Sequence, residues 1–83
     1  MRAEKKATIK PEAGLHARPA AEFAKKARQF TAEIMVSKGN KEANAKSPMK
    51  IMTLGAKKGD EVVIRAEGDD AEEAVDTLIE LIS

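Results

Sequence analysis

The polar and hydrophobic positions of the chain follow two different periods. Residues 5–10 and 32–37 alternate between apolar and polar side chains, which predicts strands with one buried face each. Residues 61–67 form an apolar-rich segment bounded by glycine-aspartate turns, and we expect a strand there as well. Gly39-Asn40 is typical of a tight hairpin turn, so residues 41–45 are expected to return as a short strand.

Three other segments are predicted to be helical. Apolar residues at helical spacing predict amphipathic helices over residues 17–30 and 71–82. Ser47-Pro48 is typical of a helix start, and Gly55 is a C-terminal stop for that short helix. Asp70 and Glu73 fit a capping box for the last helix. The predicted apolar faces consist of Ala20, Phe23, Ala24, Ala27 and Phe30 in the first helix and of Ala71, Ala74, Val75, Leu78, Ile79 and Ile82 in the last.

The element order is therefore β-α-β-β-α-β-α, which indicates an α+β fold. The natural way to bury the three apolar helix faces is to place them against one face of an antiparallel sheet. With 83 residues, the chain is expected to form a single domain, residues 1–83, with one core. Phe23 and Phe30 are the only aromatic residues, so the core is expected to consist of Ala, Val, Ile, Leu and Met.

Composition and charge narrow the class of protein. The 15 basic and 14 acidic side chains nearly cancel, unlike the strongly basic balance of a nucleic-acid binder. The absence of cysteine excludes disulfides and thiolate metal sites. Residues 1–6 carry charges with no apolar signal region after them, and no apolar run approaches the length of a bilayer span. We expect a cytoplasmic protein that neither inserts into a membrane nor binds nucleic acid.

The region around His16, the single histidine, predicts an anion site. If His16 is the N-cap of the first helix, Pro19 stands at its third position and has no N–H to bond the cap. The backbone amides of Ala17 and Arg18 then remain free at the positive end of the helix dipole, where phosphate binds. The Arg18 guanidinium adds a permanent charge whose fork geometry suits phosphate oxygens. The anion that best fits this arrangement is a phosphoryl group on the histidine itself.

Two plainer readings of His16 compete with this one. A lone histidine near a helix start is often an ordinary surface residue or an indifferent cap. Metal binding is disfavoured, because the chain offers no second histidine and no cysteine as further ligands. We therefore expect neither a metal nor a cofactor.

Three stretches of the sequence resemble the HPr family, the histidine-containing phosphocarriers of the bacterial phosphoenolpyruvate-dependent sugar phosphotransferase system. Residues 14–20, GLHARPA, resemble the active-site signature, and residues 44–55 resemble the segment around the regulatory serine. Residues 66–74 are also similar to the family. The resemblance covers the whole chain in family order. It implies an open-faced β-sandwich with strand order 1-4-2-3 and three helices on one face.

The resemblance also implies a mechanism. Phospho-Enzyme I would pass its phosphoryl group to Nδ1 of His16, and His16 would pass it to the IIA domain of a sugar permease. Arg18 and the backbone amide of Ala17 would hold the phosphoryl oxygens. The chain would act as a stoichiometric carrier rather than as an enzyme, contributing position and electrostatics.

By position, the resemblance implies that partners bind a face made of the first helix and the short helix. Exposed apolar residues on a short helix beside the site suit transient docking, although the core is an alternative place for the two methionines. Lys25, Arg28, Lys46 and Lys50 would complement acidic partners. The residues of the implied face are Ala17, Ala21, Glu22, Phe23, Lys25, Arg28, Pro48, Met49 and Met52.

Ser47 is a second predicted site. In some bacteria, the matching serine is phosphorylated by HPr kinase/phosphorylase, and the product binds a transcriptional regulator. The alternative is that Ser47 acts only as a helix N-cap. Pro48 departs from the bulky residue that the family has at this position, and this change removes part of an apolar contact patch.

Three other functions remain as alternatives. A regulatory paralogue would bind partners without carrying phosphoryl groups, but such relatives can lack the histidine that this chain keeps. A nitrogen-related phosphocarrier would share the chemistry and differ in its partners. A small RNA-binding module is disfavoured, because residues 55–59 place three residues between the glycines where a KH loop has two, and no Tyr or Trp is present to stack bases.

Overall fold

The computed structural model describes residues 1–10 and 17–82 of the chain. Its elements follow the order that the sequence predicts. They are β1 (Arg2–Thr8), α1 (Ala17–Ala27), β2 (Glu33–Lys38), β3 (Lys41–Asn44), α2 (Pro48–Met52), β4 (Glu61–Glu67) and α3 (Ala71–Ile82).

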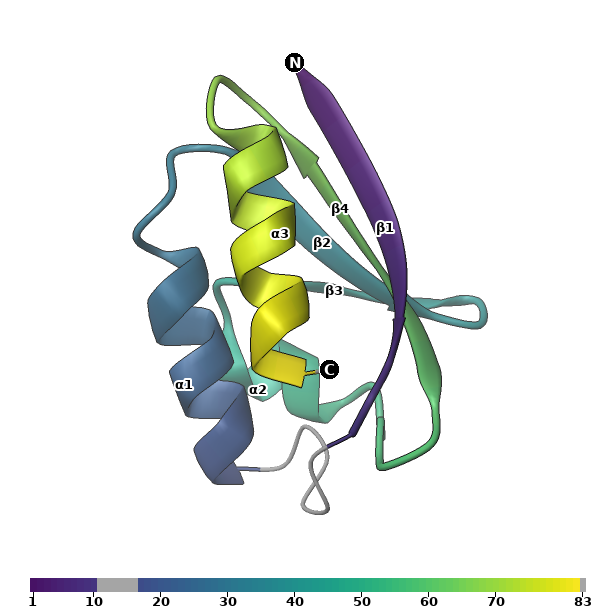
Figure 1. Cartoon of the computed structure of the whole chain (residues 1–83). Helices are drawn as coiled ribbons and strands as arrows, with labels where there is room; N and C mark the ends of the chain where they lie inside the picture. Colours follow the sequence, from purple (N-terminus) through teal and green to yellow (C-terminus); the bar gives the residue numbers. More distant parts are fainter. Residues whose placement is uncertain (11–16, 83) are drawn as a thin grey trace.

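The four strands form one antiparallel sheet in the order β1-β4-β2-β3. The central strand β4 pairs along its full length with β1, from Arg2 opposite Glu67 to Thr8 opposite Glu61. All three helices lie on one face of the sheet, and the other face is open (Figure 1). The expected open-faced β-sandwich with strand order 1-4-2-3 is confirmed.

The core lies between the sheet and the helices. Alternate residues of β4 and β2 point into it, so Val62, Ile64 and Ala66 are buried while their neighbours are exposed or half-buried. The helices contribute the faces that helical spacing predicts, except that Phe30 and Ile79 are only partly buried against the core. The largest fully buried side chains are Phe23, Ile9, Ile34, Ile51, Leu54, Ile64 and Leu78.

The expectation of methionine in the core is wrong. Met49 and Met52 are 76% and 42% exposed, and Met35 is half-buried on the outer face of β2. The physical reason on α2 is its length, since a five-residue helix offers one narrow inward stripe, which Ile51 occupies. The buried aromatic ring of Phe23 supplies volume on the α1 side instead.

The largest differences from the predicted element bounds are in β1 and α1. β1 begins at Arg2 rather than at residue 5, because backbone pairing with β4 extends through residues whose side chains do not alternate. The strand ends at Thr8, and the buried Ile9 donates its N–H to the Asp60 carbonyl at 2.9 Å. α1 ends at Ala27, after which Phe30 N–H bonds the Ala27 carbonyl three residues back in a tightened final turn.

The Asp70 carboxylate has different partners from those of the predicted capping box. It accepts hydrogen bonds from the backbone N–H groups of Thr31 and Ala32, each at 2.8 Å. These bonds tie the loop between α1 and β2 to the start of α3. The turn before α3 makes this approach close, since Gly68 lies directly over Ala32.

The Asp70 bonds predict a pH-dependent stability. The N–H of Thr31, followed by that of Ala32, lowers the pKa of Asp70 below its ordinary value of 3.8. Because the folded pKa is depressed, the stabilisation is present above the unfolded pKa and is lost as pH falls through the folded one. We expect Asp70→Asn to unfold at lower urea concentration than the wild type at neutral pH and to match it in strong acid. Asp69→Asn is the control, and an equal loss in both variants at neutral pH would contradict this role of Asp70.

Candidate functional site

The predicted anion site is at the amino end of α1. The helix begins at Ala17, the residue after His16, which confirms the predicted start and places Pro19 at the third helical position. The first turn contains no acidic residue, so no carboxylate of its own neutralises the partial positive charge of the free amides. His16 and Gly14 lie outside the described residues, and the predicted role of the Arg18 side chain also lies outside them.

Ile9 and Lys10, which precede residues 11–16 in the sequence, are held by backbone hydrogen bonds. Lys10 N–H donates to the carbonyl of Ile82, the last residue of α3, at 2.8 Å. Ile9 accepts from Gly59 N–H at 2.8 Å and donates to the Asp60 carbonyl at 2.9 Å. The end of α3 and the loop before β4 therefore fix the segment that leads into the site.

Asp60 organises that loop in a way that the sequence did not predict. Its carboxylate accepts from Lys57 N–H at 3.0 Å and pairs with the Lys38 ammonium at 3.2 Å. The bond from Lys57, followed by that from Lys38, lowers the pKa of Asp60. Lys38 also donates to the Gly55 carbonyl at 3.2 Å, so it joins the end of β2 to the turn after α2. No local sequence signal relates Lys38 to this loop.

Ser47 has the structural role predicted for it. It is the N-cap of α2, with extended backbone angles, and its hydroxyl oxygen accepts a hydrogen bond from Lys50 N–H at 3.3 Å. Pro48 occupies the first helical position, as expected. The residue is half-buried at the start of a helix that packs against α1.

The residues predicted for partner binding fall on one side of α1 and on α2. Ala21, Lys25 and Arg28 are exposed and lie on the same helical face, because they are separated by four and three positions. The structure brings this face to α2, since the Arg28 Nε–H donates to the carbonyl of Lys46 at 3.1 Å. On α2, Met49 and Met52 are exposed and Pro48 is half-buried, so the two methionines are not core residues.

Phe23 is a wrong assignment to this face. Its ring is 1% exposed and packs in the core, so it is not accessible to a partner in the folded protein. Helical spacing had already grouped it with the buried Ala20, Ala24 and Ala27. The remaining surface residues Ala21, Lys25, Arg28, Pro48, Met49 and Met52 are called the α1/α2 face below.

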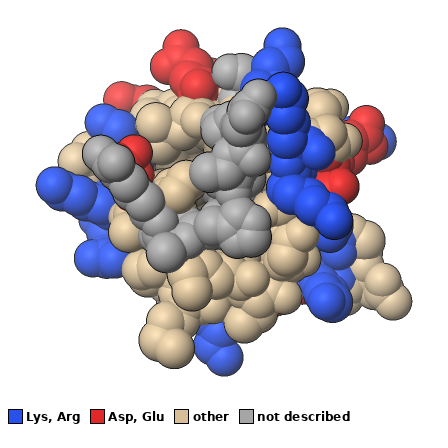
Figure 2. Space-filling model, turned by 90° about the horizontal axis from the view of Figure 1, so that it is seen from below, with Lys and Arg blue, Asp and Glu red and all other residues tan. Residues whose placement is uncertain are grey.

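The end of the molecule that contains the start of α1 is rich in basic side chains. Figure 2 views this end and shows Lys and Arg side chains in a row along one side and in a smaller group on the opposite side. Acidic side chains on this face lie towards its rim, and uncharged side chains cover much of its lower part. Such a surface favours the approach of an acidic partner.

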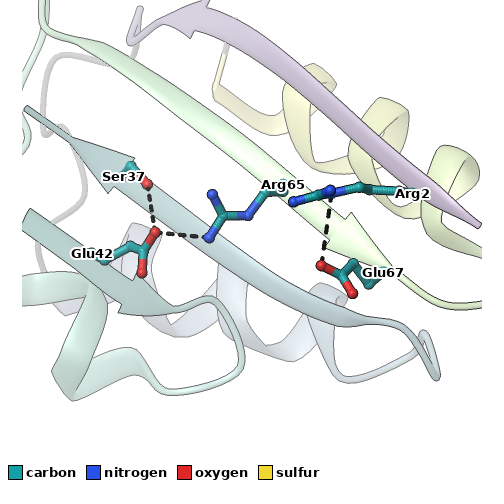
Figure 3. Close-up of polar contacts among 5 residues, drawn as sticks. All are labelled: Arg2, Ser37, Glu42, Arg65 and Glu67. Atoms are coloured by element: carbon teal, nitrogen blue, oxygen red, sulfur yellow. Dashed lines mark hydrogen bonds and ion pairs between the residues drawn. The ribbon is translucent and has the colours of Figure 1, made fainter.

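The open face of the sheet carries a polar network rather than an apolar patch. Arg65 on β4 pairs with Glu42 on β3 at 2.8 Å, and the Ser37 hydroxyl donates to the same carboxylate at 3.4 Å (Figure 3). Arg2 and Glu67 form a longer ion pair of 3.7 Å between exposed side chains. These contacts lie on the sheet face opposite the helices, away from the α1/α2 face.

Two features of the described part of the chain bear on other functions. Within residues 1–10 and 17–82, no three His, Cys, Asp or Glu side chains are grouped closely enough to hold a metal ion. Among the same residues, none of the helices has the length and apolar composition needed to cross a membrane.

A four-stranded antiparallel sheet with three helices on one face, and a helix that begins directly after the single histidine, places the chain among the small open-faced β-sandwich proteins. The family model described as "PTS HPr component phosphorylation site" matches residues 3–83, a range that includes His16. The chain belongs to the HPr family of phosphocarrier proteins of the phosphotransferase system.

Individual relatives agree with this assignment. Phosphocarrier protein HPr of Vibrio cholerae is 51% identical over 79 residues, which cover 95% of this chain and 93% of the relative. The crystal structure of a phosphocarrier protein HPr from Bacillus anthracis superposes with a TM-score of 0.96 at 40% identity and covers 99% of this chain and 98% of the other. The HPr-like protein Crh of Halalkalibacterium halodurans is 43% identical over 79 residues, covering 95% and 94% of the two chains.

Proposed function

We propose that this chain carries phosphoryl groups from phospho-Enzyme I to the IIA domains of sugar permeases, with Nδ1 of His16 as the carrier atom. The observation that supports this most directly is the start of α1 at Ala17, immediately after the single histidine. Membership of the HPr family supports the same role. The retained histidine favours a carrier over a regulatory paralogue.

Each transfer exchanges one phosphorus bond for another. In the first step, the lone pair of His16 Nδ1 attacks the phosphorus of phospho-Enzyme I, and the bond from phosphorus to Enzyme I breaks as the new N–P bond forms. In the second step, a histidine of the IIA domain attacks the same phosphorus and His16 leaves. The free amides of Ala17 and Arg18 and the Arg18 guanidinium hold the phosphoryl oxygens during both steps.

The test of this function is phosphorylation in solution. The protein is incubated with Enzyme I and radiolabelled phosphoenolpyruvate, and the adduct is mapped by mass spectrometry. We expect a label on His16 that is labile in acid and stable in alkali, and that moves to an added IIA domain. A labelled Enzyme I that leaves this chain unlabelled would refute the proposal.

The α1/α2 face is the proposed docking surface for both partners. Met49 is 76% exposed on α2, so removing its apolar contact with a partner leaves the core intact. We expect Met49→Gln to raise the KM of Enzyme I for this protein about three- to tenfold, as loss of an interface anchor does. Met35→Gln, on the outer face of β2 and away from α2, is the control. Equal KM changes in the two variants would contradict docking through α2.

Regulation through Ser47 remains a prediction of the resemblance. The structure accounts for the serine as the N-cap of α2. Crh-type relatives are consistent with a regulatory branch of the family, since Crh of Bacillus subtilis is described as a catabolite repression HPr. A purified HPr kinase/phosphorylase with ATP provides the test: phosphoserine at Ser47 would establish regulation, and an unmodified chain would leave only the capping role.

A further inference from the structure

Arg28 and Lys46, two basic residues predicted to contact partners, each donate a side-chain hydrogen bond to a backbone carbonyl at or near the other residue. Arg28 Nε–H donates to the carbonyl of Lys46 at 3.1 Å. The Lys46 ammonium, in turn, donates to the carbonyl of Phe30 at 2.8 Å in a partly buried position. The two bonds run in opposite directions between the end of α1 and the residue before the N-cap of α2.

Both segments joined by this pair are also fixed locally. Lys46 N–H donates to the Asn44 side-chain oxygen at 2.9 Å, and Ser47 N–H donates to the Asn44 carbonyl at 3.1 Å, which forms a tight turn. On the other side, Phe30 N–H bonds the Ala27 carbonyl at 3.2 Å. The reciprocal bonds therefore join two ordered segments, so they fix the orientation of the side chains that make them.

The Arg28 bond uses the Nε–H donor of the guanidinium. A guanidinium is planar and has five donors, so fixing Nε also fixes the plane in which its two terminal nitrogens lie. Those terminal nitrogens form the fork that binds a carboxylate with two parallel hydrogen bonds. Among the described residues of α1 and α2, Lys25 and Lys50 are the other exposed cations, and neither side chain donates such a bond to a backbone carbonyl.

We propose that Lys46 is a positioning residue that orients the Arg28 guanidinium for two-pronged binding of a carboxylate on the surface of the partner protein. This rests on the proposed phosphocarrier function, in which the α1/α2 face docks to acidic partners. Lys46 itself is held by the Phe30 carbonyl and acts through Arg28. An arginine side chain that is ordered before binding loses less conformational entropy in the complex. This smaller entropy loss is expected to raise the affinity about two- to tenfold.

The test compares Lys46→Met with Lys50→Met. Both substitutions remove one positive charge and keep an unbranched side chain, but only Lys46 donates to the Phe30 carbonyl. In NMR spectra of the free protein, the Nε–H signal of Arg28 should exchange slowly in the wild type and in Lys50→Met, and quickly in Lys46→Met. This readout needs no partner, and a general charge effect would leave it unchanged.

A double-mutant cycle with Arg28→Lys completes the test. Arg28→Lys keeps the charge and removes both the Nε donor and the fork. In the wild-type background, we expect Lys46→Met to weaken binding of Enzyme I more than Lys50→Met does. In the Arg28→Lys background, we expect the two substitutions to weaken that binding equally. Equal losses in the wild-type background, or unchanged Nε–H exchange in Lys46→Met, would overturn the inference.

These outcomes are separable from failure of the proposed function. If Enzyme I labels His16 in every variant while the Lys46 and Lys50 variants behave alike, the carrier role stands and the positioning role falls. If Enzyme I labels none of them, the carrier role itself is refuted, and so is the positioning role that rests on it.

Discussion

His16→Ala is expected to abolish phosphoryl transfer from phospho-Enzyme I to this protein. The substitution removes the only imidazole in the chain, so no other side chain offers a nitrogen of this nucleophilicity at the amino end of α1. The measurement is the acid-labile radioactivity that remains with the protein after incubation with Enzyme I and labelled phosphoenolpyruvate. We expect none above background.

Arg18→Ala tests the group that is proposed to stabilise the transferred phosphoryl group, separately from the carrier atom on His16. Loss of one charged donor that acts in the transition state slows comparable reactions by about 100-fold, so we expect slow but complete labelling of this variant. Thermal unfolding of both variants serves as the control for folding. Acid-labile label in a folded His16→Ala protein would exclude His16 as the acceptor.

Gly68→Ala is expected to produce the largest loss of stability among single substitutions at the glycines that the structure describes. Gly68 has a φ of +147°, a region that residues with a side chain rarely adopt. A β-carbon there would lie 2.7 Å from Cα of Ala32, which is backbone and has little room to move. Strain and overlap together are expected to cost about 2–5 kcal/mol and to lower Tm by about 10–30 °C.

Gly39→Ala is the matched control for that experiment. Gly39 also has a positive φ, +61°, but nothing lies within 4 Å of the position of an added β-carbon. We expect a loss of about 1 kcal/mol, from the backbone conformation alone. Calorimetry on the two variants therefore compares Gly68 with an unobstructed position of positive φ, and equal Tm changes would contradict the extra cost expected at Gly68.

Local patterns predicted most of the fold, because the periods of strands and helices are local properties. The spacing of Ala20, Phe23, Ala24 and Ala27 gave the buried face of α1, and the paired residues Ser47-Pro48 gave the start of α2. The same spacing explains the one wrong residue of the partner face. The resemblance assigns Phe23 to the partner face by position, whereas its helical spacing assigns it to the core, where the structure has it.

Long-range contacts could not be predicted in this way. Asp70 and Thr31 are 39 positions apart, and Arg28 and Lys46 are 18 apart, so no local period relates them. The early start of β1 has a similar cause, since Arg2 is in a strand because it pairs with Glu67 and not because of its own neighbours. For the candidate site, the sequence predicted the helix start after His16, whereas the bonds that hold Lys10 and Asp60 emerged only from the structure.

The bond from Lys10 to the last residue of α3 has a practical consequence for tethering the protein. Ile82 ends beside the segment that leads into the site, whereas the Met1 carbonyl accepts from Gly68 N–H at the opposite end of the sheet (Figure 1). A dye, resin or surface linked through the amino terminus leaves the α1 entrance clear. The same linkage after Ile82 places its bulk where the phosphoryl donor is proposed to approach, so it is expected to block that approach sterically.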